Sequence, residues 1–462
     1  MHTTNNITDK LRQQLPPSRV ALPRETGERR SGGGVKTIEG GGRVFGGRVL
    51  LVVFDDDPTG IQTVHSCLLV TNWSEENLVR AFEDEAPFFY VLTNSRALTA
   101  ADARRVLTDA VEAVVRVNKR YGYRLICISR SDSCLRGHFP LETDVMREVL
   151  TRNNIKVWEK TPFCPAFIES GRVTIDGAHY MVVPAAEEGE ENRLVPVSET
   201  EFARDNVFGY KSSVLTEYIR EKGADPADYD IINAQSYDEL YSYCDRFFAE
   251  MEEHEGAVVI RSSSSLPKAL SGIPDKPMLT PEDLGISGGA GLFIVGSHVK
   301  KTTEQLEALL TCEGVKGMEL PIDAILNDSE ALLHDTLQLL ANCISEGITP
   351  VVYTSRKEVR IDDADKRQHL GQTVSNFLVS IVRHLPVTPA YLVAKGGITS
   401  HDILTHGLCV KVGRVMGQAI NSVPCVMAEL NGKPVPYIIF PGNVGNKESL
   451  KEVYLKNKRI KK

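Results

Sequence analysis

The sequence predicts an α/β protein of two domains, each a mostly parallel sheet flanked by helices, with a cleft between the domains. Continuous apolar runs rich in β-branched residues alternate with helical patterns, which is typical of βαβ units. The alternation stops at residues 271–290, where Pro, Gly and Ser cluster, and then restarts. A chain of 462 residues is also too long for one compact core and about right for two or three domains.

Residues 1–47 precede the first apolar run and are rich in Gly, Arg, Pro and Thr. We expect a loosely ordered lead-in, because this composition offers little apolar surface to bury. The first residues lack the apolar stretch of a signal peptide. Acids and prolines space the arginines, so a solvated tail is expected here rather than a nucleic-acid-binding arm.

The first predicted domain covers residues 48–275. It begins with R-V-L-L-V-V-F at Arg48, a run that suits a parallel strand buried on both faces. Further strands are predicted at 87–92, 124–128 and 257–260, with a helix over 101–120 between them. The acidic stretch 187–191 is expected to be a surface loop.

The second predicted domain covers residues 285–462 and repeats the alternation. Strands are expected at 291–295, 317–320, 350–353, 390–393 and 436–440. Helices are expected at 302–310, 329–344 and 366–383, with a short one from Ser400 and a final helix rich in lysine.

Composition narrows the range of partners and compartments. A net charge of −8 and a pI near 5.9 give no basic field for nucleic acid, so a small anionic substrate would need local arginines. No apolar run reaches the 18 or more residues of a membrane span. The nine cysteines include no C-x-x-C pair, which favours a reducing cytoplasm over a disulfide framework or a zinc site.

Polar residues follow three apolar runs of the first domain, where ligands of open α/β sheets usually bind. They are Asp55-Asp56-Asp57, Thr93–Arg96 and the segment 129–137. Three adjacent carboxylates after a buried strand repel one another, which favours a functional site over a solvent-facing turn. Arginine forks suit a carboxylate or phosphate, although a single arginine more often forms an ordinary ion pair. The three segments together predict anion-binding side chains beside acids and hydroxyls.

The corresponding strand ends of the second domain carry glycine. Gly296-Ser297 follows one run, K-G-G-I-T-S at 395–400 follows another, and P-G-N-V-G at 441–445 follows a third. Glycine lets the backbone approach a phosphate closely, and a helix that follows offers free N–H groups. The chain contains no G-x-x-x-x-G-K-[ST] segment and no G-x-G-x-x-G after a strand. We therefore expect a nucleotide site that is neither a P-loop nor a Rossmann fingerprint.

The segments with these residues form an ordered set that resembles the motifs of the four-carbon acid sugar kinase family, which includes D-threonate, erythronate and 3-oxo-tetronate kinases. The resemblance runs from about Arg48 to the C-terminus. It rests on D-D-D-P-T-G-I-Q-T-V-H, T-N-S-R-A-L, S-R-S-D-S-C-L-R-G-H-F-P-L-E-T, P-A-F-I-E-S-G-R-V-T-I-D-G-A-H-Y, V-P-V-S-E-T-E-F-A-R-D, G-S-H-V-K-K-T-T-E-Q and K-G-G-I-T-S-H-D-I. The resemblance implies an N-terminal acid-sugar-binding domain, a C-terminal nucleotide-binding domain and ATP-dependent phosphorylation of a small acid sugar.

The resemblance also implies which residues form the site. Substrate contacts would be made by the acids Asp56 and Asp57, which would also be catalytic, and by Arg96, Arg130, Ser131, Asp132 and Ser133. ATP contacts would be made by Ser297, Gly396, Gly397, Ile398, Thr399 and Gly442. The cofactors would be ATP and Mg²⁺, with no residue assigned as a metal ligand, and a homodimer is compatible with this arrangement.

The sequence departs from the family pattern at two positions of the third motif. Many members have lysine where Arg130 stands and threonine where Cys134 stands. The first difference keeps the charge but changes the geometry of the donors, so it bears on which acid sugar is bound rather than on the phosphoryl-transfer chemistry.

Two other functions fit part of the sequence. A haloacid-dehalogenase-like phosphatase would use Asp55 as nucleophile within D-x-D-x-T, with Thr93 as a second hydroxyl. Its later acidic metal motif G-D-x-x-x-D is absent, and the pair Asp362-Asp363 follows no apolar run. A non-catalytic sugar-acid sensor is the other alternative, but such a protein would not need both the acids and the glycine loops.

Overall fold

The computed structural model describes residues 36–37, 43–44, 49–183, 192–356 and 364–458. The lead-in at 1–47 lies outside this part apart from two short strands, β1 (Lys36–Thr37) and β2 (Arg43–Val44), which pair antiparallel. The acidic stretch 187–191 and the pair Asp362-Asp363 also lie outside the described residues.

The chain forms two compact units that do not follow its linear order. The first unit contains Met1–Val53 and Asn118–Pro274, and the second contains Phe54–Val117 and Asp275–Lys462. Strand β3 (Val49–Asp55) and helix α3 (Ala100–Tyr121) each cross from one unit to the other. The domain limits 48–275 and 285–462 stay a prediction, as does the cleft between the domains.

The main sheet of the first unit has the strand order β11-β7-β12-β6-β3. Strands β11, β7, β12 and β6 run parallel, and the register places Ser262 beside Arg130 at their carboxyl ends. The bounds are β6 (Arg124–Arg130), β7 (Thr161–Cys164), β11 (Tyr229–Ile231) and β12 (Val258–Ser262). Every residue of β12 is buried, as the continuous apolar run predicts.

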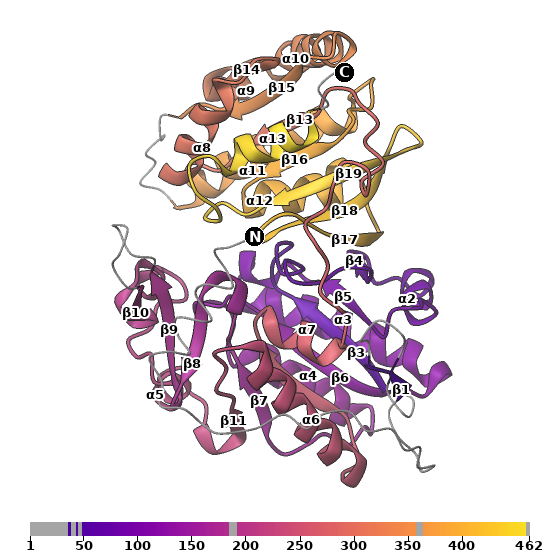
Figure 1. Cartoon of the computed structure of the whole chain (residues 1–462), viewed down its shortest axis with the longest axis vertical. Coiled ribbons are helices and arrows are strands. Elements are labelled where there is room, and N and C mark those ends of the chain that lie inside the picture. The colour runs from indigo at the N-terminus through magenta and orange to yellow at the C-terminus, as the bar shows by residue number, and fades with distance from the viewer. Residues whose placement is uncertain (1–35, 38–42, 45–48, 184–191, 357–363, 459–462) are drawn as a thin grey trace, which may run out of the picture. The chain divides into compact units, whose positions relative to one another are not determined.

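Helices and a small antiparallel sheet complete the first unit (Figure 1). Helix α4 packs on β6 and β12, and α6 packs on α7. Ser236 caps α6 by accepting a hydrogen bond from the Glu239 amide at 3.3 Å. The elements are α4 (Leu141–Arg152), α5 (Leu215–Glu221), α6 (Tyr237–Glu253), α7 (Ser265–Ser271), β8 (Arg172–Ile175), β9 (Ala178–Val183) and β10 (Arg193–Pro196).

The second unit has the strand order β5-β4-β17-β18-β19-β16-β13-β15-β14. Strands β19, β16, β13, β15 and β14 are parallel, as are β4 and β5, whereas β17 and β18 pair antiparallel with their neighbours. The bounds are β4 (Leu68–Val70), β5 (Phe88–Leu92), β13 (Leu292–Val295), β14 (Val315–Leu320), β15 (Thr349–Thr354), β16 (Leu392–Lys395), β17 (Val412–Ile420), β18 (Val423–Leu430) and β19 (Lys433–Phe440). The β17–β18 pair was not expected from the sequence.

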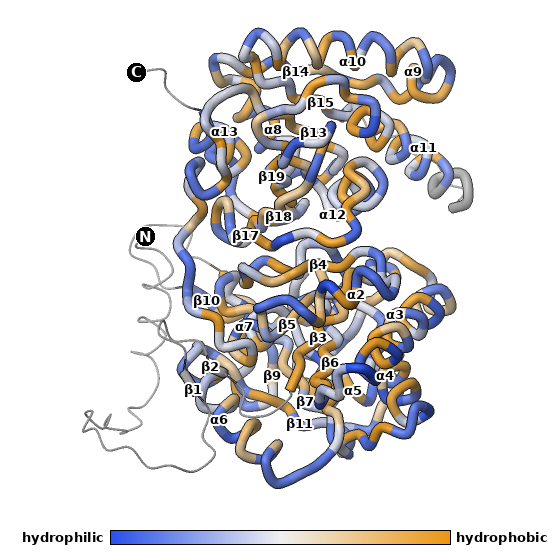
Figure 2. Tube along the Cα trace, turned by 90° about the vertical axis from the view of Figure 1, so that its right-hand side faces the viewer, coloured by the Kyte–Doolittle hydropathy of each residue, from blue (hydrophilic) through white to orange (hydrophobic). Residues whose placement is uncertain are grey.

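Helices of the second unit pack on this sheet and on one another. Helix α10 packs on β15 and α11, and α8 packs on β14 and α13. Hydrophobic and hydrophilic residues recur in turn along α10 in Figure 2, which suits a helix with one buried side. The helices are α2 (Glu75–Phe82), α8 (Lys300–Leu310), α9 (Ile322–Asn327), α10 (Ser329–Ser345), α11 (Ala364–Arg383), α12 (Gly397–Asp402) and α13 (Ser449–Asn457).

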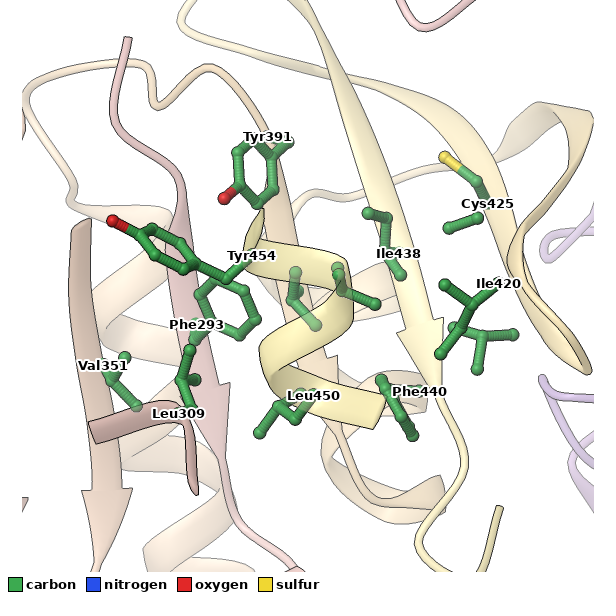
Figure 3. Packing of buried hydrophobic residues seen from close by; sticks show 14 of the residues in the cluster. Phe293, Leu309, Val351, Tyr391, Ile420, Cys425, Ile438, Phe440, Leu450 and Tyr454 are labelled. Atoms are coloured by element: carbon green, nitrogen blue, oxygen red, sulfur yellow. The ribbon is translucent and has the colours of Figure 1, made fainter. Parts of the chain in front are cut away.

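One apolar core holds the strands beneath the glycine loops of the second unit. Figure 3 shows Leu450 and Tyr454 of α13 beside Phe293 of β13 and Leu309 of α8. Phe440, the last residue of β19, belongs to the same cluster and is fully buried. Because the core fixes the ends of β13 and β19, it also fixes where their loops begin.

The structure confirms the two-domain α/β class and most of the predicted elements. The helix expected from Ser400 instead begins at Gly397, directly after Gly396, whose φ of +116° suits glycine and ends the strand abruptly. Within the described ranges, no helix is both long enough and apolar enough to cross a membrane.

Candidate functional site

The three acids after β3 have different surroundings. Asp55 is fully buried, and its backbone oxygen accepts hydrogen bonds from the amide and hydroxyl of Thr93, both at 2.9 Å. A Cβ atom added to Gly60 would lie 2.0 Å from Asp55 Oδ2, so the carboxylate packs directly against this glycine. Asp55 therefore joins the turn that follows β3 to the residue that follows β5.

Asp57 and Arg96 form the charged centre of this turn. Asp57 Oδ1 accepts hydrogen bonds from Thr59, at 2.7 Å from its amide and 2.5 Å from its hydroxyl. Asp57 Oδ2 pairs with Arg96 Nη2, while Arg96 Nη1 lies 3.7 Å from Asp56 Oδ1. The structure thus brings together three predicted site residues, with the guanidinium shared between two carboxylates.

Three glycine-bearing loops converge in the second unit. A Cβ atom on Gly396 would lie 3.0 Å from Ser297 Cβ, and one on Gly442 would lie 3.3 Å from Ser297 Oγ. A Cβ on Gly296 would collide with Thr399 Oγ1 at 2.1 Å. The loops after β13, β16 and β19 therefore meet around Ser297, in a cradle that added side chains would fill. Ile398 projects from this cradle with 68% of its surface exposed.

The acids and the cradle meet at one point. Asp57 Oδ2 lies 3.5 Å from the position of a Cβ atom on Gly397. Both residues belong to the second unit, although 340 positions separate them in the numbering, from 57 to 397. The predicted catalytic acid is therefore in contact distance of the predicted nucleotide loop.

The remaining predicted substrate residues form a group of their own in the first unit, after β6. Arg130 is buried and donates from Nη2 to Ser264 Oγ at 3.0 Å, and the Ser131 amide donates to the Ser262 carbonyl at 2.9 Å. Asp132 accepts a hydrogen bond from Arg136 Nε at 2.8 Å. The loop thus rests on the serines that follow β12.

His179 fixes the other end of this loop. Its Nε2 donates to the Ser133 carbonyl at 2.8 Å, so its Nδ1 accepts from the Thr174 hydroxyl at 2.9 Å. Burial lowers the pKa of His179 to about 4, so the ring stays neutral at physiological pH. Beside it, burial raises the pKa of the Cys134 thiol to about 11, which leaves this cysteine in its unreactive protonated form.

Sequence reasoning missed several residues that support the site. Ser129, Glu142 and Arg261 form a buried network below the Arg130 loop, with Arg261 Nη1 at 2.6 Å from Glu142 Oε2. The run R-S-S-S-S at 261–265 follows a predicted strand, so its position was a signal that could have been used. Lys395 ends β16 and is fully buried, and only its place before the two glycines pointed to it.

The loops around Ser297 suit a nucleotide phosphate because their glycines let three backbone segments pack closely around one hydroxyl side chain. Among the residues that the structure describes, no group of three or more His, Cys, Asp or Glu is arranged to hold a metal ion.

Comparisons with known proteins match two domain models to the chain, and the first model includes residues 54–117 of the second compact unit. Residues 51–266 match the model of a sugar-binding N-terminal domain, and residues 292–450 match that of a nucleotide-binding C-terminal domain. Together the two models cover well over half of the chain. No curated protein matches the sequence.

Two solved structures share the fold at low sequence identity. A Salmonella typhimurium LT2 protein, provisionally described as a tRNA synthase, is 14% identical with a TM-score of 0.62, over 88% of this chain and 98% of that chain. A Haemophilus influenzae protein of the family DUF1537 is 16% identical with a TM-score of 0.58, over 87% and 99%. A Bordetella bronchiseptica domain of the same family, a domain-swapped dimer with bound citrate, is 20% identical with a TM-score of 0.36, over 90% and 100%.

The two-domain α/β fold, with a sugar-binding and a nucleotide-binding part, defines the class of the protein. The chain belongs to the four-carbon acid sugar kinase family, known as DUF1537.

Proposed function

We propose that this protein is an ATP-dependent kinase that phosphorylates a hydroxyl group of a four-carbon acid sugar, such as a tetronate or a 3-oxo-tetronate. The observation that carries the proposal is the contact between Asp57 and Gly397 within one compact unit. A phosphoryl-transfer enzyme must bring the attacking hydroxyl and the terminal phosphate together, and an acid beside a glycine loop supplies both positions.

The acids at the end of β3 would handle the substrate hydroxyl. Asp56 or Asp57 orients the hydroxyl or accepts its proton. Arg96 already binds carboxylates in the structure, so it can exchange an aspartate for the carboxylate of the acid sugar. Arg130 is the second candidate for that carboxylate, and Ser131, Asp132 and Ser133 on the same loop would bind sugar hydroxyls.

The cradle of the second unit would hold ATP. Ser297, Gly396, Gly397, Thr399 and Gly442 would surround its phosphates through backbone N–H groups and hydroxyls. Ile398, exposed beside them, would contact the nucleotide with its apolar surface. When bound, ATP supplies the phosphoryl group and Mg²⁺ neutralises its developing charge.

The phosphatase alternative is less well supported by the geometry. Its nucleophile would be Asp55, whose carboxylate oxygens pack against Gly60. Burial alone does not distinguish it from Asp56, which is 1% exposed. A nucleophile must approach the phosphorus of a substrate, whereas the position of Asp55 suits a bracing role. The sensor alternative gives no reason for an acid so close to the nucleotide loop.

The proposal is tested by measuring ADP release from ATP with a panel of four-carbon acid sugars, against phosphate esters without ATP. ADP release that requires one acid sugar supports the kinase. Phosphate-ester hydrolysis without ATP would support the phosphatase, and sugar binding without ATP binding in calorimetry would support the sensor. We also propose a cytoplasmic location, and the homodimer stays a prediction that sedimentation analysis can test.

A further inference from the structure

Two lysines hold the loop that follows β19. Lys395 Nζ donates hydrogen bonds to the carbonyl oxygens of Pro441 at 2.6 Å and Gly442 at 3.2 Å. Lys301 Nζ donates to the carbonyl oxygen of Asn443 at 3.2 Å. Lys395 is fully buried and lies 4.0 Å from the centre of the Phe440 ring, whereas Lys301 is exposed on α8. Three successive carbonyls of the proposed phosphate loop are thus oriented by lysine side chains.

Neither lysine is balanced by an acid. Across the described parts of the chain, no carboxylate pairs with Lys395 or Lys301, and the charged group that acts on Lys395 is Lys301, which has the same sign. Strands β13 and β19, which flank β16, add no charged side chain that acts on Lys395. A buried ammonium group without a counter-ion is costly, so an anionic ligand at this loop would supply the missing negative charge.

The loop is also connected to the other parts of the cradle. Thr302 Oγ1 lies 3.0 Å from Ser297 Oγ and 3.2 Å from the Gly442 carbonyl, so its proton can be donated to either. Lys395 itself precedes Gly396 and Gly397 in the chain. A change in the charge or hydrogen bonds of the Lys395 amino group would therefore alter the positions of all three loops that surround Ser297.

We propose that Lys395 is a positioning residue that fixes the 441–442 loop and takes up a proton when the phosphates of Mg·ATP bind to the cradle. This inference rests on the proposed function, because it requires nucleotide phosphates at these loops. Lys395 acts through its hydrogen bonds to the loop carbonyls and through the positive charge of its ammonium group. It does not touch the reacting atoms.

The direction of the proton exchange follows from the surroundings of the amine. Burial, and to a smaller extent Lys301, lower the pKa of Lys395 to about 6, so the free protein holds it mainly neutral at about pH 7.5. Nearby phosphate charge favours the ammonium form and raises this pKa. Binding therefore draws a proton from solvent between the two pKa values, and affinity for Mg·ATP falls as pH rises through that interval. At about pH 6 half of the lysine is already charged, and the uptake disappears about one to two pH units lower.

The experiment is titration calorimetry of the full chain with Mg·ATP, without acid sugar, in two buffers of different ionisation enthalpy at about pH 7.5. The wild type should take up about one proton per nucleotide bound. Lys395→Met should abolish the uptake and raise the dissociation constant roughly tenfold to a hundredfold, the scale for a lost charged hydrogen bond. Lys301→Met removes an exposed charge at the same loop and should keep the uptake, with less than about a fivefold loss.

The outcomes separate this inference from the proposed function. Binding of Mg·ATP without proton uptake, or an unchanged uptake in Lys395→Met, would overturn the inference alone. Absence of any Mg·ATP binding would overturn the proposed function as well. If Lys395→Met does not fold, the wild type still decides the question, because its uptake at about pH 5.5 should fall to roughly a quarter of the value at about pH 7.5. A constant uptake at both pH values would contradict the role of Lys395.

Discussion

Gly397 lies against Asp57, so that a Cβ atom on the glycine would be 3.5 Å from Asp57 Oδ2. At this distance the added Cβ atom would be in ordinary van der Waals contact with the carboxylate. One side-chain carbon therefore fits between the backbone of the proposed nucleotide loop and the acid. A single substitution at Gly397 should therefore disturb both ATP binding and the position of the Asp57 carboxylate.

Replacing Gly397 by valine should raise the Michaelis constant for ATP by at least about tenfold and lower turnover, because the added methyl groups meet both the phosphate site and Asp57. Gly397→Ala should be much milder, since its single Cβ fits and the φ angle of this residue is not positive. Gly371→Val, in open space on α11, is the matched control. Steady-state kinetics with both substrates would measure the effects. A normal turnover in Gly397→Val would show that a side chain at this position does not disturb Asp57.

Replacing Arg96 by leucine tests the carboxylate-binding role. With acid sugars it should cost roughly 1.5–3 kcal/mol of transition-state binding, the usual scale for a hydrogen bond to a charged group. With the corresponding neutral polyol the loss should be smaller, because only the support of Asp57 is removed. The ratio of kcat/KM for the two substrates is the measurement. Equal losses with the two substrates would mean that Arg96 only pairs with Asp57 and does not bind the substrate carboxylate.

His179 should make the protein less stable in acid. Its pKa is about 4 in the folded protein and 6.5 as a free side chain, so the unfolded state binds the proton first as pH falls. The free energy of unfolding should fall by about 1.4 kcal/mol per pH unit from pH 6.5 down to about 4 through this residue. His179→Gln should remove that part of the slope in urea unfolding series. An unchanged slope would exclude His179 as its source.

The Arg261–Glu142 pair should be a large stability term, because its side chains are only 4% and 5% exposed. Arg261→Met should cost about 3–5 kcal/mol, since it removes the buried positive charge that neutralises the Glu142 carboxylate. Adding Glu142→Gln should recover much of this loss, as no unpaired charge then remains. Arg105→Met, which breaks an exposed pair with Asp102, should leave the unfolding free energy nearly unchanged. A similar loss of unfolding free energy in Arg261→Met and Arg105→Met would contradict the view that burial makes the first pair the stronger one.

The sequence predicted those parts of the fold that depend on local patterns. Apolar runs such as the one that became β3 are strong signals, because a strand buried on both faces needs continuous apolar residues. The β17–β18 pair was missed although only Asn421 and Ser422 separate its strands, whereas its partner β4 is distant in sequence and leaves no local trace. The same reason hid the compact unit that joins residues 54–117 to the C-terminal half.

The candidate site was predicted as motifs but not as contacts. Arg96 could be named as an anion-binding residue, but its ion pair with Asp57 depends on where β5 ends relative to β3. Lys395 stands in the K-G-G-I-T-S motif but was given no role, and its complete burial between strands β13 and β19 appears only in the folded sheet. Burial is a property of the assembled sheet and cannot be read from the neighbouring residues alone.

The most direct test of the account is turnover of the amide variants Asp55→Asn, Asp56→Asn and Asp57→Asn in one ADP-release assay with the acid sugar. A lost proton acceptor commonly costs about a hundredfold to ten-thousandfold. The account predicts at least about a hundredfold loss for Asp56→Asn or Asp57→Asn with ATP binding retained, and a smaller loss for Asp55→Asn. An inactive Asp55→Asn beside active Asp56→Asn and Asp57→Asn variants would contradict it, because Asp55 would then be the reacting group.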